Sequence, residues 1–215
     1  PNHARVPSVA GSRARAPVRR PGARVPALPP TAVKHVARRP SPPGEHARAR
    51  RRTECDYAVR LSEKQRLRAQ YGLREKQMAH AFAEARKEPG LTGEALVELL
   101  EMRLDALVLR SGFARTILQS RQAVVHRHVL VDGKIVDRPS FQVKPGQTIQ
   151  IKPKSQAMTP FQVAAAGAHR NVLPQLPEYL DVTLEKLNAQ LVRRPKRSEV
   201  PVTCEVQLVV EYYAR

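Results

Sequence analysis

The sequence contains no tryptophan, and aromatic residues make up only 4% of its 215 residues. Few flat side chains are therefore present to stack successive unpaired bases of a single strand. Cysteine is scarce too: Cys55 and Cys204 form neither a CxxC motif nor a disulfide framework, which indicates a reducing compartment. No segment reaches the roughly 18 apolar residues of a membrane span, and the basic N-terminal stretch lacks the apolar core of a secretory signal. We expect no membrane partner.

Positive charge, in contrast, is abundant. The chain has 38 Lys and Arg against 19 Asp and Glu, a formal net charge of +19 at pH 7 and a pI near 11.0. A chain with this balance most often binds a polyanion, and nucleic acid is the commonest one. The charge is uneven, because residues 1–53 hold 13 of the 38 basic residues but only one of the 19 acidic residues.

The first 44 residues are rich in Pro, Ala and Arg, contain ten of the 19 prolines and show no apolar period. Such a segment does not bury enough apolar surface to offset its own ordering entropy. We expect residues 1–44 to be a basic arm that becomes ordered only on a nucleic acid; a disordered tail without a partner is the alternative. A short basic cluster follows, which we expect to bind RNA: Arg48, Arg50, Arg51 and Arg52.

The next part of the chain has the apolar spacing of helices. The pattern predicts helices over residues 56–70, 74–87 and 92–103, the last with Thr92 as its N-cap. We therefore expect a helical RNA-binding domain over residues 45–101.

Two further helices are expected beyond this point. Residues 103–110 are amphipathic, and Thr116 with Gln119 has capping-box spacing for a helix that runs to about His126. Arg121 falls in the apolar arc of this helix, so its guanidinium is expected to reach out to solvent along the core. At 100° per residue, four polar side chains share one face of the same helix: Arg115, Gln119, Gln122 and His126.

A β-hairpin is predicted next, because Asp132-Gly133 between two β-branched runs suits a type I′ turn, in which both central residues have positive φ. A compact unit of two helices and a small antiparallel sheet is therefore expected over residues 102–152. For residues 207–213 strand propensity is high, but the period leaves a strand and a short buried helix both open. The other expected elements are strands at 129–131, 134–136, 148–151 and 179–182 and a helix at 159–167.

The expected fold class is therefore α+β. It combines the basic N-terminal arm with a mostly helical domain and an inserted RNA-binding module, in which two helices pack on a small antiparallel sheet. The module is expected to extend over residues 102–199.

The segment RLDALVLRSGFARTILQSRQAVVHRHVLVDGKIV (103–136) closely resembles the RNA-binding module named after small-subunit ribosomal protein four. Blocks on both sides resemble the bacterial family of that ribosomal protein, in the order the family has them. The resemblance covers about residues 30–215. The flanking blocks are RPSPPGEH (39–46), DYAVRLSEKQRLRAQYG (56–72), LTGEALVELLEMRLD (91–105) and QLVVEYYAR (207–215).

This resemblance implies a structural protein of the small ribosomal subunit in the bacterial cytoplasm. Members of the family bind the 5′ domain of small-subunit rRNA early and nucleate assembly there. They also touch ribosomal protein five of the subunit. Together with protein three they form the region where mRNA enters its channel, and the interface between proteins four and five affects decoding accuracy. The resemblance further implies that residues 200–215 complete the helical domain.

The resemblance also implies RNA contacts for basic and polar residues in both parts of the chain. Lys and Arg neutralise phosphates, while Gln and neutral His donate single hydrogen bonds. The expected RNA-binding residues of the helical domain are Tyr57, Arg60, Lys64, Arg68 and Lys76. Those of the module are Arg103, Arg110, Arg115, Arg121, Gln122, His126, His128 and Lys134.

The sequence departs from this family in two respects. Many members hold zinc with four N-terminal cysteines, but residues 1–54 contain none, and His3, His35 and His46 lack the spacing of a tetrahedral site. We therefore expect no zinc and no other cofactor. Position 127, usually Gly in the family, is Arg127 here.

An enzyme is not expected. His126 and His128 would suit a metal or acid–base pair only with a third ligand or a carboxylate nearby in sequence, and none is present. The chain has no GxxxxGK[ST] loop, and the module and its flanks leave no room for a catalytic domain. The remaining alternatives are a free RNA chaperone or regulator with the same module and, ranked last, an RNA-modifying enzyme.

Overall fold

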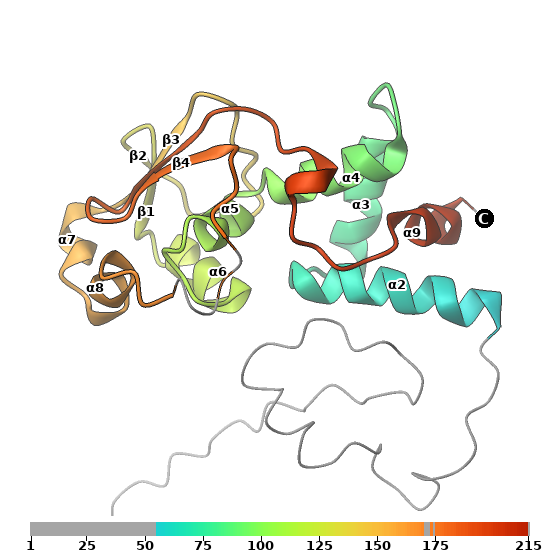
Figure 1. Cartoon of the computed structure of the whole chain (residues 1–215), viewed down its shortest axis with the longest axis horizontal. Helices are drawn as coiled ribbons and strands as arrows, with labels where there is room; N and C mark the ends of the chain where they lie inside the picture. The colour runs from blue at the N-terminus through green and yellow to red at the C-terminus, as the bar shows by residue number, and fades with distance from the viewer. Residues whose placement is uncertain (1–54, 170–172, 174, 215) are drawn as a thin grey trace, which may run out of the picture.

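The computed structural model describes residues 55–169, 173 and 175–214. The predicted arm at 1–44 and the cluster Arg48, Arg50, Arg51 and Arg52 lie outside the described residues. The described chain forms two parts side by side along its longest axis (Figure 1). We call them the helical half, made of α2, α3, α4 and α9, and the sheet half, made of α5 to α8 and the strands.

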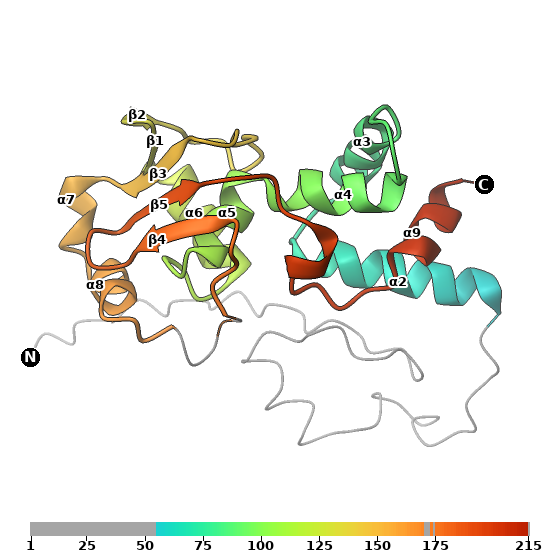
Figure 2. The same cartoon turned by 45° about the horizontal axis from the view of Figure 1, so that its top comes forward.

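The helical half is built on amphipathic helices whose apolar faces meet. Its helices are α2 (Asp56–Gln70), α3 (Glu75–Ala85), α4 (Thr92–Glu101) and α9 (Val206–Tyr213), preceded by the 3₁₀ turn η2 (Arg197–Glu199). Helix α9 returns from the far end of the chain and lies along α2 (Figures 1 and 2). The buried side chains that join these elements include Leu67, Met78, Phe82, Leu96, Leu100 and Val209.

Two predictions for this half need correction, and one open alternative is decided. Thr92 is the first helical residue of α4, and Leu91 occupies the N-cap position, so the expected Thr92 cap is wrong. Helix α4 also ends at Glu101, because Arg103 has extended backbone angles and begins the next helix as its N-cap. For residues 207–213, where the sequence leaves a strand and a short buried helix both open, the structure has helix α9, whose Val209 is buried in the core.

The sheet half contains one antiparallel sheet of five strands in the order β2-β1-β3-β5-β4. The strands are β1 (Val129–Val131), β2 (Lys134–Ile135), β3 (Thr148–Ile151), β4 (Leu180–Thr183) and β5 (Asn188–Leu191). Strands β3 and β5 pair with Ile149 opposite Ala189, so the late strands join the sheet begun by the hairpin. Its helices are α5 (Leu104–Arg110), α6 (Ile117–Val125), α7 (Pro153–Gln156) and α8 (Thr159–Ala165).

The predicted hairpin is confirmed, with φ values of 48° at Asp132 and 77° at Gly133. The Asp132 carboxylate also accepts hydrogen bonds from the Thr148 backbone N–H at 2.8 Å and from the Gln147 side-chain amide at 2.7 Å. The turn residue therefore anchors the hairpin to β3. Strand β5 has no counterpart among the predictions, because its segment NAQL lacks β-branched and aromatic residues.

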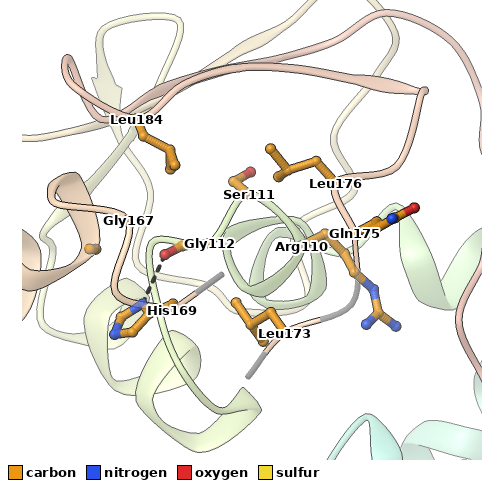
Figure 3. Close-up of a pocket in the computed structure, with 10 residues that line it drawn as sticks. Arg110, Ser111, Gly112, Gly167, His169, Leu173, Gln175, Leu176 and Leu184 are labelled. Atoms are coloured by element: carbon orange, nitrogen blue, oxygen red, sulfur yellow. Dashed lines mark hydrogen bonds between the residues drawn. The ribbon is translucent and has the colours of Figure 1, made fainter. Parts of the chain in front are cut away.

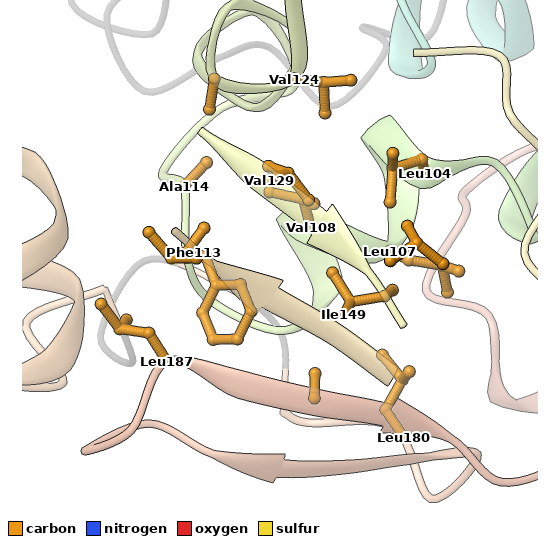
Figure 4. Packing of buried hydrophobic residues seen from close by; sticks show 14 of the residues in the cluster. Leu104, Leu107, Val108, Phe113, Ala114, Val124, Val129, Ile149, Leu180 and Leu187 are labelled. Atoms are coloured by element: carbon orange, nitrogen blue, oxygen red, sulfur yellow. The ribbon is translucent and has the colours of Figure 1, made fainter. Parts of the chain in front are cut away.

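A second core lies between one face of this sheet and helices α5 and α6 (Figure 4). Phe113, in the turn between the two helices, is fully buried, as are Val124 of α6 and Ile149 of β3. This packing buries Ser120, Ala123 and Val124 of α6, whereas Leu118 and Val125 of the same helix are exposed. The predicted α+β fold class is confirmed.

Candidate nucleic-acid interface

Helix α6 begins with the cap that its sequence predicts. The Thr116 hydroxyl accepts a hydrogen bond from the Gln119 backbone N–H at 3.2 Å. The Gln119 side chain reaches one residue further back than a capping box, because its Oε1 accepts from the Arg115 backbone N–H at 2.9 Å. The cap therefore fixes the start of the helix and the position of Arg115 together.

Three of the four polar residues predicted to share a face of α6 line one hollow. Gln119, Gln122 and His126 border a cavity of about 280 Å³, with His128 beside them and α8 on the other side. Arg115, the fourth, is exposed at the start of the helix. The surface therefore combines donors on α6 with an apolar recess against α8.

Two histidines stand at the wall of this hollow. The rings of His126 and His128 lie 6.0 Å apart in an edge-on arrangement, and His128 meets the ring of Phe161 edge-on at 5.7 Å. The Nδ1 atom of His128 lies 2.8 Å from the Ser155 hydroxyl. Burial, with the charges of His126 and Lys152, lowers the pKa of His128, so this imidazole is neutral at pH 7.

The structure places Arg110 inside the protein rather than on the RNA-facing surface. Its guanidinium pairs with Glu101, which is fully buried and also accepts hydrogen bonds from the Tyr71 hydroxyl at 2.5 Å and the Tyr179 hydroxyl at 2.8 Å. Burial and the Glu101 charge raise the pKa values of both phenols, so they remain donors. These four residues, which we call the Glu101 cluster, connect the two halves.

A second buried acid holds two more of the predicted RNA-binding residues. Asp105 pairs with Arg103 at 2.7 Å and with Arg121 at 2.8 Å. Arg121 also donates to the backbone carbonyls of Gly72 at 2.7 Å and Tyr71 at 3.3 Å in the helical half. The expectation that its guanidinium reaches out to solvent is wrong, because buried acceptors lie within its reach.

Of the predicted RNA-binding residues in the helical half, three are held in ion pairs and two are exposed. Arg60 pairs with Glu211 at 2.7 Å, and Lys64 is buried between Glu75, at 2.9 Å, and the Tyr212 ring, 4.4 Å from its centroid. Arg68 pairs more loosely with Glu75, at 3.4 Å. Tyr57 is 48% exposed and Lys76 is exposed.

Only some of the predicted RNA-binding residues are exposed at the surface. In the part of the chain that the structure describes, no hydrogen bond or ion pair engages the side chains of Lys76, Arg115, Gln122 or Lys134, and all four are exposed. His126 is exposed, and its ring lies edge-on to the His128 ring. Five of the residues that we predict to contact RNA are called the RNA-facing set below: Arg115, Gln122, His126, His128 and Lys134.

Residues that sequence reasoning missed form the far wall of the hollow. Met158 is the N-cap of α8, and Phe161 is buried against His128. Thr159-Pro160 is a helix-start signal that locates α8 but not its contact with α6. Arg127 adopts a left-handed φ of 62° and pairs with Asp137 at 3.2 Å.

A second cavity, of about 240 Å³, lies between the end of α8 and the turn after α5 (Figure 3). Leu173, Leu176 and Leu184 point into it, and His169 Nδ1 lies 3.0 Å from the Gly112 carbonyl oxygen at its edge. Arg110 borders it but is bound to Glu101. The lining is therefore mainly apolar and offers few groups to a nucleic acid.

Among residues 55–169, 173 and 175–214, no group of three or more His, Cys, Asp or Glu is arranged to hold a metal ion. Within the same residues, no helix is both long and apolar enough to cross a membrane.

Comparison with known proteins agrees with this picture over most of the chain. Residues 19–101 match the family described as ribosomal protein S4/S9 N-terminal domain, and residues 102–149 match the S4 domain. The chain is 80% identical over 188 residues to the small ribosomal subunit protein uS4 of Beutenbergia cavernae, covering 87% of this chain and 90% of that protein. It is 67% identical over 203 residues to the uS4 protein of Leifsonia xyli subsp. xyli, covering 94% and 98%.

The fold and the match of residues 102–149 define an RNA-binding protein built around an S4 domain. The matches on both sides of that domain narrow the class further: the chain belongs to the uS4 family of small ribosomal subunit proteins. This family is structural and not enzymatic, as the sequence predicts.

Proposed function

We propose that this uS4 protein, a structural component of the bacterial small ribosomal subunit that binds rRNA in the cytoplasm, is a primary binder of the 5′ domain of that rRNA. In this role it binds early and nucleates assembly of the domain. The observation that carries the proposal is 80% identity to a small ribosomal subunit protein uS4 over 87% of the chain.

The division of the charged residues supports this role. Arg110 in the Glu101 cluster and Arg121, which also donates to the Tyr71 and Gly72 carbonyls, hold the two halves together. Four residues of the RNA-facing set are exposed: Arg115, Gln122, His126 and Lys134. A binder that nucleates folding of RNA benefits from a fixed arrangement of contacts, because little ordering free energy is then lost on binding. We propose that residues 45–101 with 200–215, and residues 102–199, are the two units so fixed.

The type of RNA recognised follows from the same surface. A-form duplexes hide their base edges in a deep major groove, so proteins read their shape, phosphates and 2′-hydroxyls. Exposed Arg115 and Lys134 suit phosphates, and Gln122 and neutral His128 suit hydroxyl groups. We include the basic cluster at residues 48–52 and the arm at 1–44 among the phosphate-binding segments.

Family membership supports a wider setting for the same protein. In our proposal the chain lies beside ribosomal proteins five and three where mRNA enters its channel, and its contact with protein five influences decoding accuracy. Co-purification of the three proteins in small subunits, and a change in misreading on disrupting the contact with protein five, are the expected results.

The central test is binding of the purified chain to a 5′-domain rRNA fragment across a salt series, with a scrambled RNA of equal length as the control. The proposal requires tight binding to the fragment that survives moderate salt and is not shared by the scrambled RNA. Equal, salt-labile binding to both RNAs would mean that charge alone acts, as in a general RNA chaperone. Deleting residues 1–44 should lower the salt dependence without removing the preference.

A further inference from the structure

We propose that the hollow between α6 and α8 receives one unstacked base of the bound RNA. The inference rests on the proposed function and adds a second kind of contact to it, since the rest of the surface offers mainly charge and single donors. The hollow is lined by residues of α6, the turn before it, the start of β1 and the start of α8.

The walls of the hollow have the chemistry that holds a base. Phe113 and Phe161 are buried behind it, and Met158, which is 46% exposed, stands at its edge. The chain has only four phenylalanines, and two of them are at this hollow. Unpaired bases bind by stacking on flat side chains, with hydrogen bonds to their edges. The His128 ring, held by Phe161 and Ser155, supplies a neutral flat surface of this kind.

The rim carries an amide and no acid. Gln122 is exposed, and its side-chain amide makes no hydrogen bond within the part of the chain that the structure describes. An amide presents a donor and an acceptor together, which matches the edge of adenine that bears N6 and N7. None of the described residues that line the hollow is Asp or Glu, so the base and its phosphates meet no repulsion there.

Two cations lie close to the hollow. Arg115 is exposed, and its backbone N–H donates to the side chain of Gln119 at 2.9 Å. The Lys152 backbone N–H donates to the His128 carbonyl at 2.8 Å, which places Lys152 next to the hollow. A base that leaves its stack carries two flanking phosphates with it, so cations beside a base-sized apolar recess complement one nucleotide. A charged peptide or an apolar metabolite would match only one of the two features.

The test uses a matched pair of substitutions. Gln122→Trp fills the hollow from an exposed position, whereas Gln162→Trp makes the same change on α8, at an exposed residue that does not line the hollow. Both variants are checked for folding by circular dichroism and then titrated with the 5′-domain rRNA fragment. Gln122→Ala, which removes the amide without filling the space, is a third variant.

We expect Gln122→Trp to lower affinity about tenfold, the loss of one base–aromatic stack, while Gln162→Trp binds as the unaltered chain does. The salt slope should not change, because no phosphate contact is removed. Ultraviolet crosslinking of the complex, read by mass spectrometry, should place a nucleotide on the peptides that contain His128 or Phe161. Gln122→Trp should abolish that crosslink.

Two different failures are distinguishable. If the unaltered chain does not prefer the rRNA fragment to a scrambled RNA, the proposed function fails and the hollow loses its ligand. If the unaltered chain prefers the fragment but Gln122→Trp binds it as tightly as Gln162→Trp, and no crosslink maps to the hollow, only the proposal of a base in the hollow is overturned.

Discussion

Replacing Glu101 with Gln should destabilise the protein strongly, because this residue neutralises a buried arginine and joins the two halves. Its carboxylate is fully buried and binds Arg110, Tyr71 and Tyr179 at once. The side chain of Arg110 is only 13% exposed. Glutamine keeps the shape but removes the charge, so the guanidinium is left buried without an anion.

Breaking a buried ion pair in this way costs roughly 3–5 kcal/mol of unfolding free energy. For a chain of this size the melting temperature should fall by about 6–20 °C. The assay is urea unfolding followed by far-UV circular dichroism, with Glu98→Gln as the control. Glu98 pairs with Arg194 at 3.0 Å, but the Arg194 side chain is 62% exposed, so this loss should stay below about 1 kcal/mol.

A double-mutant cycle sharpens the prediction. Arg110→Met removes the cation, so the double variant should lose less stability than the two single losses added together, by about 0.5–3 kcal/mol. A loss below about 1 kcal/mol for Glu101→Gln, or strictly additive losses in the cycle, would refute the reasoning that this cluster is a coupled, buried ion pair.

The remaining predictions concern the surface, a thiol and a helix contact. Arg115→Ala should lower the slope of log K against log salt for the 5′-domain fragment by about 0.7–0.9, one phosphate, and an unchanged slope would remove Arg115 from the RNA-facing set. Burial raises the pKa of the Cys204 thiol to about 11, so iodoacetamide at pH 8 should label exposed Cys55 much faster than Cys204. Peptide mass spectrometry measures the two labelling rates, and equal rates would contradict the burial of Cys204. A Cβ on Gly93 would lie 2.9 Å from Val206 Cγ1, so Gly93→Leu should lower the free energy of unfolding in urea by about 1–3 kcal/mol. Adding Val206→Ala should restore part of this loss, and no recovery would mean that the clash is not with α9.

Local signals predicted most of the fold. Helix α2 has the predicted bounds, and the hairpin turn adopts the positive φ values that Asp132-Gly133 indicates. The elements that the sequence left undecided or missed depend on distant contacts: residues 207–213 form a helix that packs against α2 and α4, and β5 forms because β3 and β4 pair with it. The residues of each segment therefore do not predict its structure on their own.

The candidate interface was predictable only in part, for a related reason. Periodicity places Gln119, Gln122 and His126 on one face, and the hollow brings them together. Periodicity does not reveal that Arg110 and Arg121 have buried acids within reach, because Glu101 and Asp105 lie on other helices. The contact of Phe161 with His128 likewise depends on how α8 packs, which the sequence does not state locally.

The return of α9 to α2 fixes the order in which the chain folds during its own synthesis. Arg60 pairs with Glu211 across 151 positions, and the Tyr213 hydroxyl donates to Glu75 across 138. Contacts of such long sequence separation form only after the whole intervening chain has been translated. All the buried residues of the core in the sheet half have been translated by residue 191, whereas the core of the helical half still lacks Val209. The part that the ribosome makes first is therefore the part whose core closes last.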